Sequence, residues 1–305
     1  MKAVVLRATG GPEALQLADV PVPQVGDGHS LVRVRAAGVN FADVLVRQGR
    51  YPEQPELPTV LGSEVAGEVD GRRVVGLPRH GGGGYAEYVA VPDEWLLPLP
   101  DSASFAEGAA FPLTFLTAWI PLTRQARVRP GTTVLVLAAA GGVGSAAVQV
   151  ARALGARVVA AAGAEDKLDL PRELGAEEAY TYDGLADVRA DVVVDPVGGE
   201  HFAGVLRLVR PLGVVLALGS AAGPWPGLDP ALLVGRNVGV QGFYLGRLMR
   251  LDPGVVRAAF EELLPLWERG ALRPVVGTEL PLARAGEAHA LIEQRRHRGK
   301  VVLVP

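Results

Sequence analysis

An apolar strand that runs through a glycine turn into a helix constrains this chain more than any other feature. Residues 133–137 read TVLVL, and residues 138–144 form the turn. Val143–Leu154 follows as a helix with its apolar residues on one face. A strand that is apolar at every position is typical of a parallel sheet covered on both faces. This part of the chain is therefore predicted to have an α/β fold.

The alternation of apolar strand and helix continues through the middle of the chain. Short helices are expected at 168–174 and 202–209. Strands are expected at 133–137, 157–161, 179–181, 191–194, 214–218 and 238–241. Strands that alternate with helices build a doubly wound parallel sheet, and six of them fit one dinucleotide-binding domain.

The glycine turn matches the dinucleotide fingerprint G-x-G-x-x-G in part. Gly141 and Gly144 take its second and third positions, while Ala139 takes the first. The chemistry needs bare backbone beside a pyrophosphate and a helix N-terminus aimed at the anion. The candidate pyrophosphate contacts are Ala140, Gly141, Gly142, Val143 and Gly144. A purely structural strand-to-helix turn is the alternative.

The end of the second strand of this domain distinguishes the two nicotinamide cofactors. An NAD site usually places an acid here to hold the ribose 2′-hydroxyl, but residues 159–163 contain none. Gly163 leaves room for a 2′-phosphate and Lys167 follows it, which favours NADPH, although Glu165 and Asp166 count against a strong phosphate site. The basic cluster 295–300 is interpreted as a solvated helix end, with a contribution to phosphate binding as the alternative.

The first third of the chain instead predicts short strands separated by Gly, Pro and Asp. These strands are expected at 2–6, 30–36, 65–69, 73–75 and 85–91. They suggest a small β-rich domain. The last segment, with helices at 253–268 and 283–295 and a strand at 300–304, is expected to return to that domain because no seventh parallel strand is visible. The predicted division is 1–112 with 247–305 for the β-rich domain, and 113–246 for the dinucleotide domain.

Composition narrows the classes of function. A net charge of −3 gives no bulk electrostatic case for binding nucleic acid or an anionic membrane. The absence of cysteine excludes disulfides, a thiolate nucleophile and thiolate metal sites. The uncharged stretch 130–151 is better explained by strand, turn and helix than by a membrane span, because it carries glycines and polar residues. No targeting segment is visible, so a cytoplasmic protein is expected.

Several short segments together match one known family. They are Gly38–Asp43 (GVNFAD), Gly49–Pro52 (GRYP), Leu61–Gly67 (LGSEVAG), Gly84–Val89 (GYAEYV), the turn at 138–144 and Leu218–Ser220 (LGS). With them the chain resembles, over essentially its whole length, the zinc-less quinone oxidoreductases of the medium-chain dehydrogenase/reductase superfamily, the group that includes zeta-crystallin. The resemblance implies a GroES-like catalytic domain beside the dinucleotide domain.

The resemblance also implies that the site is free of metal. Zinc alcohol dehydrogenases of the same superfamily bind catalytic zinc through Cys and His, and the matching positions here are Asn40 and Ser63. Neither side chain is a competent zinc ligand in that geometry. None of the five histidines is paired with another at metal-ligand spacing.

The site residues carried over from the family fall into two groups. Asn40 and Tyr51 are the polar pair expected nearest the reacting carbonyl, and Asn40 is also expected to contact the cofactor. The further cofactor contacts implied by the resemblance are Thr117, Tyr182, Leu218, Gly219, Ser220 and Phe243. An ordinary helix-facing threonine and a strand-end tyrosine are the alternatives for Thr117 and Tyr182.

The expected function is NADPH-dependent reduction of a quinone. A quinone relaxes the need for a proton donor, because its reduced oxygens can take protons from water, while Asn cannot titrate and Tyr51 would need a pKa far below about 10. An NADPH-dependent alkenal or enone reductase remains open as an alternative. A non-catalytic, crystallin-like NADPH-binding protein is a third hypothesis.

The last parallel strand suggests how the chain assembles. Residues 236–243 should lie at the edge of the doubly wound sheet, and an open edge is usually covered or paired. The family pairs two such edges about a twofold axis, which implies a homodimer with Val238, Val240 and Phe243 close to the seam. A monomer whose edge is covered by residues 223–233 is the alternative.

Overall fold

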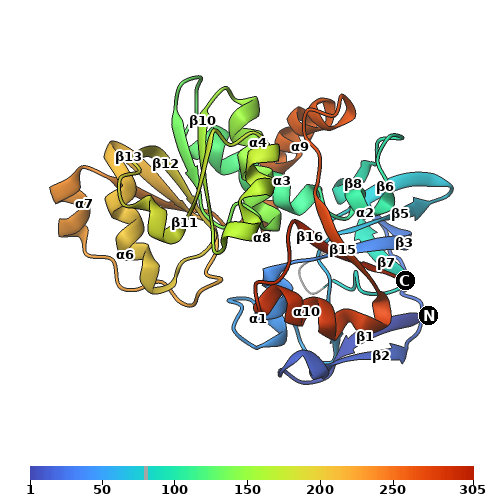
Figure 1. The fold of residues 1–305 in the computed structure, drawn as a ribbon. Coiled ribbons are helices and arrows are strands. Elements are labelled where there is room, and N and C mark those ends of the chain that lie inside the picture. The colour runs from blue at the N-terminus through green and yellow to red at the C-terminus, as the bar shows by residue number, and fades with distance from the viewer. Residues whose placement is uncertain (79–81) are drawn as a thin grey trace. The chain divides into compact units, whose positions relative to one another are not determined.

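The computed structural model describes residues 1–78 and 82–305, which form two compact units (Figure 1). Unit 1 comprises Met1–Leu113 and Arg273–Pro305, and unit 2 comprises Thr114–Leu272. Residues 247–272, which the sequence analysis assigned to the β-rich domain, therefore belong to unit 2. Their helix buries an apolar face that includes Val256, Phe260 and Leu263. Within unit 2, Glu262 also accepts a 2.7 Å hydrogen bond from Trp119 Nε1 and forms an ion pair with Arg124.

Unit 2 contains the expected doubly wound sheet. Its strands are β9 (Thr133–Val136), β10 (Arg157–Ala162), β11 (Glu178–Thr181), β12 (Ala190–Asp195), β13 (Val209–Ala217) and β14 (Gly239–Gly242). All neighbours are parallel, in the order β11-β10-β9-β12-β13-β14. The prediction of a parallel six-stranded sheet is confirmed.

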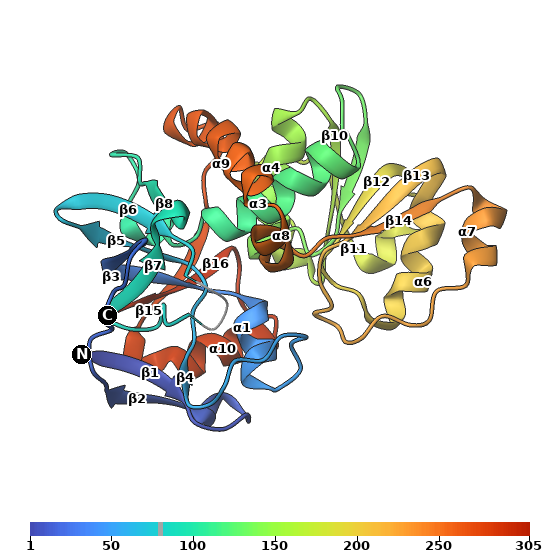
Figure 2. The same ribbon diagram turned by 180° about the vertical axis from the view of Figure 1, so that it is seen from behind.

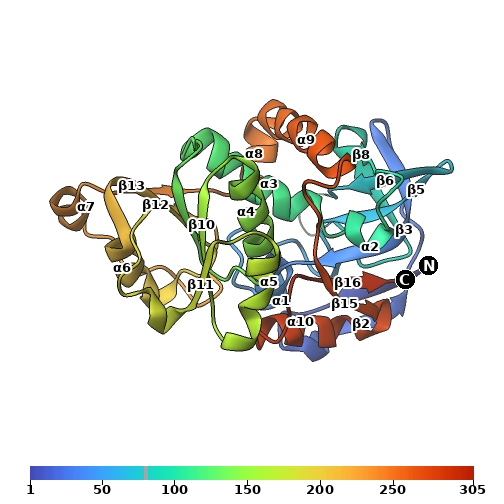
Figure 3. The same ribbon diagram turned by 45° about the horizontal axis from the view of Figure 1, so that its top comes forward.

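Helices cover both faces of this sheet. The helices of this part of the chain are α3 (Pro112–Ile120), α4 (Gly142–Ala153), α5 (Asp169–Glu173), α6 (Phe202–Val205), α7 (Pro230–Arg236), α8 (Leu245–Leu251) and α9 (Pro253–Glu268). Leu135 and Val193 join a buried cluster with Phe202 of α6, while the alternate residues Val134 and Val136 point to the face that α4 covers. Figure 3 shows α4 and α5 on one side of the strands and α6 on the other.

The strand β14 lies at the edge of the sheet, as predicted (Figure 2). The N–H of Phe243 donates to the carbonyl of Ala217 at 3.0 Å, so odd-numbered residues of this strand bond toward β13. Because successive N–H groups of a strand point in opposite directions, the N–H of Val240 faces the open edge. Exposed apolar side chains lie in the segments that adjoin this edge strand, namely Leu212 (92% exposed) and Val234 (75% exposed).

Unit 1 is β-rich, as predicted. Its strands are β1 (Lys2–Leu6), β2 (Leu15–Asp19), β3 (His29–Val39), β4 (Thr59–Val60), β5 (Val65–Val69), β6 (Arg72–Gly76), β7 (Tyr88–Pro92), β8 (Leu96–Pro98), β15 (Val276–Pro281) and β16 (Lys300–Val304). They form a three-stranded sheet, β2-β1-β4, and a seven-stranded sheet in which β16 pairs with β3. The sequence analysis missed β15, which pairs with β16 in parallel.

The described residues of unit 1 also form the helices α1 (Phe41–Arg47), α2 (Phe105–Gly108) and α10 (Ala285–Glu293). Helix α10 contacts both β15 and β16 (Figure 3). It is joined to α1 by an ion pair of 2.6 Å between Arg47 Nη2 and Glu293 Oε2, in which the Arg47 side chain is fully buried. This pair fixes α1, which carries Asn40 at its N-terminus.

Within residues 1–78 and 82–305, one helical run has the length and apolar composition that crossing a membrane would require. It is Phe105–Gln125, with a mean hydropathy of 1.2 over its most apolar window, and 72% of that window is buried inside the protein. Such burial is typical of a helix in the core of a folded domain. The stretch 130–151 forms β9, the turn and α4, as predicted.

Candidate functional site

In unit 2 the glycine turn leads from β9 into α4 and leaves the N-terminus of that helix without a side-chain cap. Ala138 adopts a left-handed backbone with φ of 49°, which turns the chain sharply after β9. A Cβ at Gly144 would lie 2.1 Å from the Ala138 carbonyl oxygen, so only glycine allows the helix to approach the strand this closely. Gly141 is the N-cap and provides no side-chain hydrogen bond. The first amides of this 12-residue helix are therefore available to an anion.

Tyr182 and Gly163 lie beside this turn. The backbone N–H of Ala138 donates to the Tyr182 hydroxyl at 3.1 Å, and a Cβ at Gly163 would be 4.0 Å from Tyr182 Cε2. Gly163 is exposed directly after β10, and Lys167 ends the short turn that follows it. The structure thus brings together the glycine turn, Gly163 and Tyr182 at the carboxyl ends of β9, β10 and β11.

The other predicted cofactor residues of unit 2 lie along the same edge of the sheet, apart from one. Leu218, Gly219 and Ser220 follow β13, and Phe243 follows β14, so all of them lie at carboxyl ends of parallel strands. Leu218 is fixed by its N–H, which donates to the carbonyl of Asp195 at 2.9 Å. Thr117 is instead a buried residue of α3.

Asp195 is a buried carboxyl group at the end of β12. Its Oδ1 accepts hydrogen bonds from the N–H groups of Val197 (2.7 Å) and Gly198 (3.0 Å). Burial raises the pKa of Asp195 above its ordinary value, although these two donors and the nearby His201 lower it in part. The carboxyl group shapes the turn that leads away from β12.

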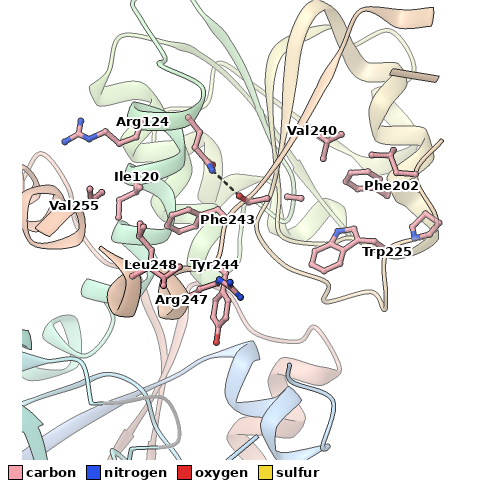
Figure 4. Close-up of a pocket in the computed structure, with 16 residues that line it drawn as sticks. Ile120, Arg124, Phe202, Trp225, Val240, Phe243, Tyr244, Arg247, Leu248 and Val255 are labelled. Carbon is pink, nitrogen blue, oxygen red and sulfur yellow. Dashed lines mark hydrogen bonds between the residues drawn. The ribbon is translucent and has the colours of Figure 1, made fainter. Parts of the chain in front are cut away.

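An apolar cleft of about 710 Å³ opens in unit 2 where β13 and β14 end (Figure 4). Its aromatic walls are Phe202, Trp225, Phe243 and Tyr244. Its lining cations are Arg124 and Arg247. Gln125 closes part of the wall, where its Nε2 donates to the Gly242 carbonyl at 3.0 Å. The cleft therefore suits a flat, largely apolar group.

In unit 1, Asn40 is held in a buried polar arrangement. Its Oδ1 accepts a hydrogen bond from Lys300 Nζ at 2.7 Å, and its Nδ2 donates to Glu64 Oε1 at 3.1 Å. Lys300 and Glu64 also form an ion pair with each other. Glu64 is anchored at its other oxygen, which accepts the Leu113 N–H at 3.0 Å.

A second buried set continues from the backbone of Asn40. The carboxylate of Asp43 accepts hydrogen bonds from the Asn40 N–H (2.9 Å), the Ser63 hydroxyl (2.9 Å) and the Tyr85 hydroxyl (3.1 Å). Burial, followed by the charge of Asp43, raises the pKa of Tyr85 well above its ordinary value of 10. The phenol therefore stays protonated.

His289 ends this set. Its Nε2 lies 3.2 Å from the Tyr85 hydroxyl, and its Nδ1 has no hydrogen-bond partner among the described residues. Burial, followed by the charge of Arg47, lowers the pKa of His289 from 6.5 to about 3. The imidazole is neutral, so Tyr85 can donate to Asp43 while it accepts from the Nε2–H of His289.

The two residues expected nearest the reacting carbonyl differ in how firmly they are held. Asn40 is only 7% exposed, whereas Tyr51 is half-buried and follows α1, with its N–H donating to the Leu45 carbonyl at 3.2 Å. Ser63 uses its hydroxyl to donate to Asp43 at 2.9 Å. In the described parts of the chain, no three His, Cys, Asp or Glu side chains are grouped so as to hold a metal ion.

Sequence reasoning missed the partners of Asn40. Lys300 begins β16, as predicted, but it is only 4% exposed and so is not part of a solvated basic cluster. Glu64 lies in a segment that matches the family, but the match implies no role for it; the signal for a buried partner is its place directly before the apolar strand β5. Nothing in the local sequence connects the two, because they are 236 positions apart.

Comparisons with known proteins agree with this geometry. Residues 26–101 match the alcohol dehydrogenase GroES-like domain, and residues 174–303 match the family described as zinc-binding dehydrogenase. The chain is 35% identical to a quinone oxidoreductase of Pseudomonas aeruginosa, with 100% of this chain and 99% of that protein covered.

Solved structures similar to the whole chain include the following two. The quinone oxidoreductase of Thermus thermophilus, determined alone and in complex with NADPH, is 46% identical with a TM-score of 0.92. A structure described as an NAD-dependent alcohol dehydrogenase is 38% identical with a TM-score of 0.90. In both cases 100% of each chain is covered.

Proposed function

The chain belongs to the quinone oxidoreductases of the medium-chain dehydrogenase/reductase superfamily, and on that premise we propose that it is an NADPH-dependent, metal-independent quinone reductase. That it is an oxidoreductase follows from the family. The observation that carries the finer proposal is the uncapped N-terminus of α4 beside an end of β10 that lacks any acidic side chain.

The residues of unit 2 fit NADPH. The amides at the start of α4 would hold the pyrophosphate, which Gly144 permits by leaving the backbone bare. Gly163 would leave space for the 2′-phosphate, and Lys167 and Tyr182 would lie on either side of that group; the short turn that Lys167 ends and the contact of Tyr182 with the glycine turn support this. Leu218–Ser220 and Phe243 follow β13 and β14 at the same carboxyl edge, and we propose that they contact the nicotinamide end. When bound, NADPH supplies a hydride.

In unit 1, Asn40 and Tyr51 are the groups proposed to meet the acceptor. The side chain of Asn40 can donate a hydrogen bond but cannot release a proton, and its orientation is fixed by Lys300 and Glu64. This suits a quinone, whose reduced oxygens take protons from water. Ser63 is already used as a donor to Asp43, which supports a reaction that does not use zinc.

The proposal is tested by NADPH oxidation with a panel of acceptors, with and without EDTA. The panel holds a naphthoquinone, phenanthrenequinone and a 2-alkenal, and a separate arm supplies NAD⁺ with a primary alcohol. We expect turnover with quinones that is unchanged by EDTA. Turnover with the alkenal alone would instead identify an enone reductase, and NADPH binding without any turnover would favour a crystallin-like role. Activity lost in EDTA and restored by zinc would overturn the metal-independent part.

We also propose that the working form is a cytoplasmic homodimer joined through the edge strand β14. The open N–H of Val240 and the exposed apolar side chains Leu212 and Val234 support such a seam. Val238 was predicted to lie near the seam together with Val240 and Phe243. It is buried in the core of unit 2, so in such a dimer it would support the edge strand from the core side.

A further inference from the structure

Three buried side chains from distant parts of unit 1 close into one polar triangle. Asn40 caps α1, Glu64 precedes β5 and Lys300 begins β16, and their exposed fractions are 7%, 0% and 4%. Each of the three contacts the other two: Lys300 with Asn40 at 2.7 Å, Asn40 with Glu64 at 3.1 Å, and Lys300 with Glu64 in an ion pair. Burying two charges is costly, so an arrangement of this kind needs a reason beyond stability.

The chemistry of the triangle allows only one orientation of the Asn40 amide. An ammonium group has donors and no acceptor, so it can face only the amide oxygen. A carboxylate has acceptors and no donor, so it can face only the amide nitrogen. A flipped amide would set NH₂ against Lys300 and oxygen against Glu64, which loses both hydrogen bonds. The backbone N–H of Asn40 is held as well, by Asp43.

Among the described residues, the triangle leaves Asn40 with one side-chain donor that it does not use. Its carbonyl oxygen is occupied by Lys300, and one of its two N–H groups is occupied by Glu64. Of its two side-chain donors, Asn40 therefore has only the second N–H left for an acceptor, and the Lys300 charge on the oxygen polarises the amide and strengthens this N–H as a donor. A donor of this kind recognises an acceptor oxygen.

We propose that Lys300 is a positioning residue which, through Asn40, makes the site selective for acceptors that bring a carbonyl oxygen. The proposal rests on the proposed function. When the acceptor gains a hydride, its carbonyl oxygen gains negative charge, and the N–H of Asn40 stabilises that charge until the oxygen takes a proton from water. Lys300 itself neither touches the acceptor nor gives up a proton.

The test is a double-variant cycle with Lys300→Met and Asn40→Ala, with Lys2→Met as the matched control. Lys2 is an exposed lysine paired with exposed Asp19, so its loss should leave kcat unchanged. Lys300→Met should lower kcat for a naphthoquinone about tenfold, as expected for one lost hydrogen bond of about 1.4 kcal/mol, and change the NADPH dissociation constant much less. In the Asn40→Ala background it should cause no further loss. The proposal would be overturned if Lys300→Met had the same kcat as the parent. It would also be overturned if the fold-loss of kcat in the double variant equalled the product of the two single losses.

A second variant guards against misfolding. Lys300→Met leaves the Glu64 carboxylate buried without its partner, which is strongly destabilising, whereas Glu64→Gln with Lys300→Met removes both charges. We expect this pair of substitutions to fold and still to show the loss of kcat. Parental activity in the neutral pair would mean that Asn40 needs no ammonium to hold it.

A readout that does not depend on turnover separates this proposal from the function it rests on. The two side-chain amide proton signals of Asn40 can be assigned in NMR spectra by their loss in Asn40→Ala. In the parent and in Lys2→Met they should exchange slowly with water, and in Lys300→Met they should exchange faster. If the parent reduces no acceptor, the proposed function fails, and the exchange data still decide whether Lys300 holds the amide. Equal exchange in all three proteins would overturn the positioning role.

Discussion

At the scale of single residues, unit 1 buries an unusual number of ionisable side chains. Arg47, Glu64 and His289 are 0% exposed and Lys300 is 4% exposed. Arg47 and Lys300 each face a carboxylate, from Glu293 and Glu64 respectively, so both cations are paired. Among the described residues no carboxylate is paired with His289, so a protonated imidazole at this place would be a buried charge without a counter-ion.

Acid should destabilise the protein through His289. Folding lowers the pKa of His289 from 6.5 to about 3, so between these values the unfolded chain binds a proton that the folded chain does not. The contribution of this site to stability is complete above pH 6.5 and is lost as the pH falls toward 3, by up to about 1.4 kcal/mol per pH unit. Urea unfolding across this window should show a shallower pH dependence for His289→Gln than for the parent.

The control for this experiment is His29→Gln, a histidine outside the buried set. Its pH profile should follow that of the parent. Parallel profiles for the parent and His289→Gln would show that the imidazole does not carry the acid sensitivity.

Lys167 should discriminate between the two nicotinamide cofactors. It ends the turn after the acid-free end of β10, so we expect NADPH to bind at least about tenfold more tightly than NADH, which is about 1.4 kcal/mol. Lys167→Ala should weaken NADPH and leave NADH nearly unchanged in titrations of cofactor fluorescence. Equal dissociation constants in the parent would contradict this expectation, and Lys2→Ala serves as the surface control.

Residues that act alone could be predicted from the sequence, while residues that act as partners could not. Asn40 followed from the family pattern, but its contact with Lys300 spans 260 positions and depends on the pairing of β16 with β3. A lysine in a run of arginines is typical of a solvated surface. Only the sheet shows that Lys300 points into the protein.

At the scale of elements, the close approach of α4 to β9 is the feature most open to test. Gly144→Ala places a methyl group 2.1 Å from the Ala138 carbonyl oxygen, so the backbone must shift. We expect a loss of about 1–3 kcal/mol in the free energy of unfolding, together with weaker NADPH binding.

Gly204→Ala is the matched control for this substitution. Gly204 lies in α6 of the same unit, and a Cβ there meets no atom within 4 Å, so alanine should be neutral or slightly stabilising. Thermal unfolding and NADPH titration of both variants give the comparison. If both alanine variants had the same stability and the same affinity for NADPH, the turn would accommodate a Cβ at position 144 without strain.

Elements were predictable where the hydrophobic period was strong. The strands β1, β5 and β16 and the helix α9 have the predicted bounds, because each has a clear apolar pattern between Gly, Pro or Asp breaks. The strand β15 (VGTELP) was missed because it has few apolar residues and is defined only by its parallel pairing with β16. The extended conformation of β15 therefore depends on its pairing with β16 rather than on the local preference of its residues.

At the scale of the whole molecule, the open edge of β14 leads to a prediction about assembly. Val240→Pro removes an N–H that faces the edge and leaves the bonds toward β13 intact, so it should raise the dimer dissociation constant at least about tenfold without unfolding unit 2. Val240→Ala keeps that N–H and is the control. Sedimentation equilibrium checks this, and a parent that is monomeric at every micromolar concentration would show that the edge is not used.

The division into units was predictable at one boundary and not at the other. The change from short strands to the strand-and-helix rhythm marks the start of unit 2 to within two residues, at Thr114. Its end could not be predicted, because α8 and α9 follow the last parallel strand and no composition change separates them from the segment that returns to unit 1. The hydrogen bond from Trp119 to Glu262, which ties α9 to α3 within unit 2, joins residues 143 positions apart.

The discontinuous build of unit 1 has a consequence for the order in which the protein is made. Strand β3 has to wait for β16 until the ribosome has translated all of unit 2, Thr114–Leu272. At about 5–20 residues per second this delay is roughly 10 to 30 seconds, long enough for a continuous domain to fold. During that time the nascent chain carries an unpaired strand edge and a Glu64 that lacks its lysine. Unit 2, with its cofactor residues, is thus complete before unit 1 can complete its sheet.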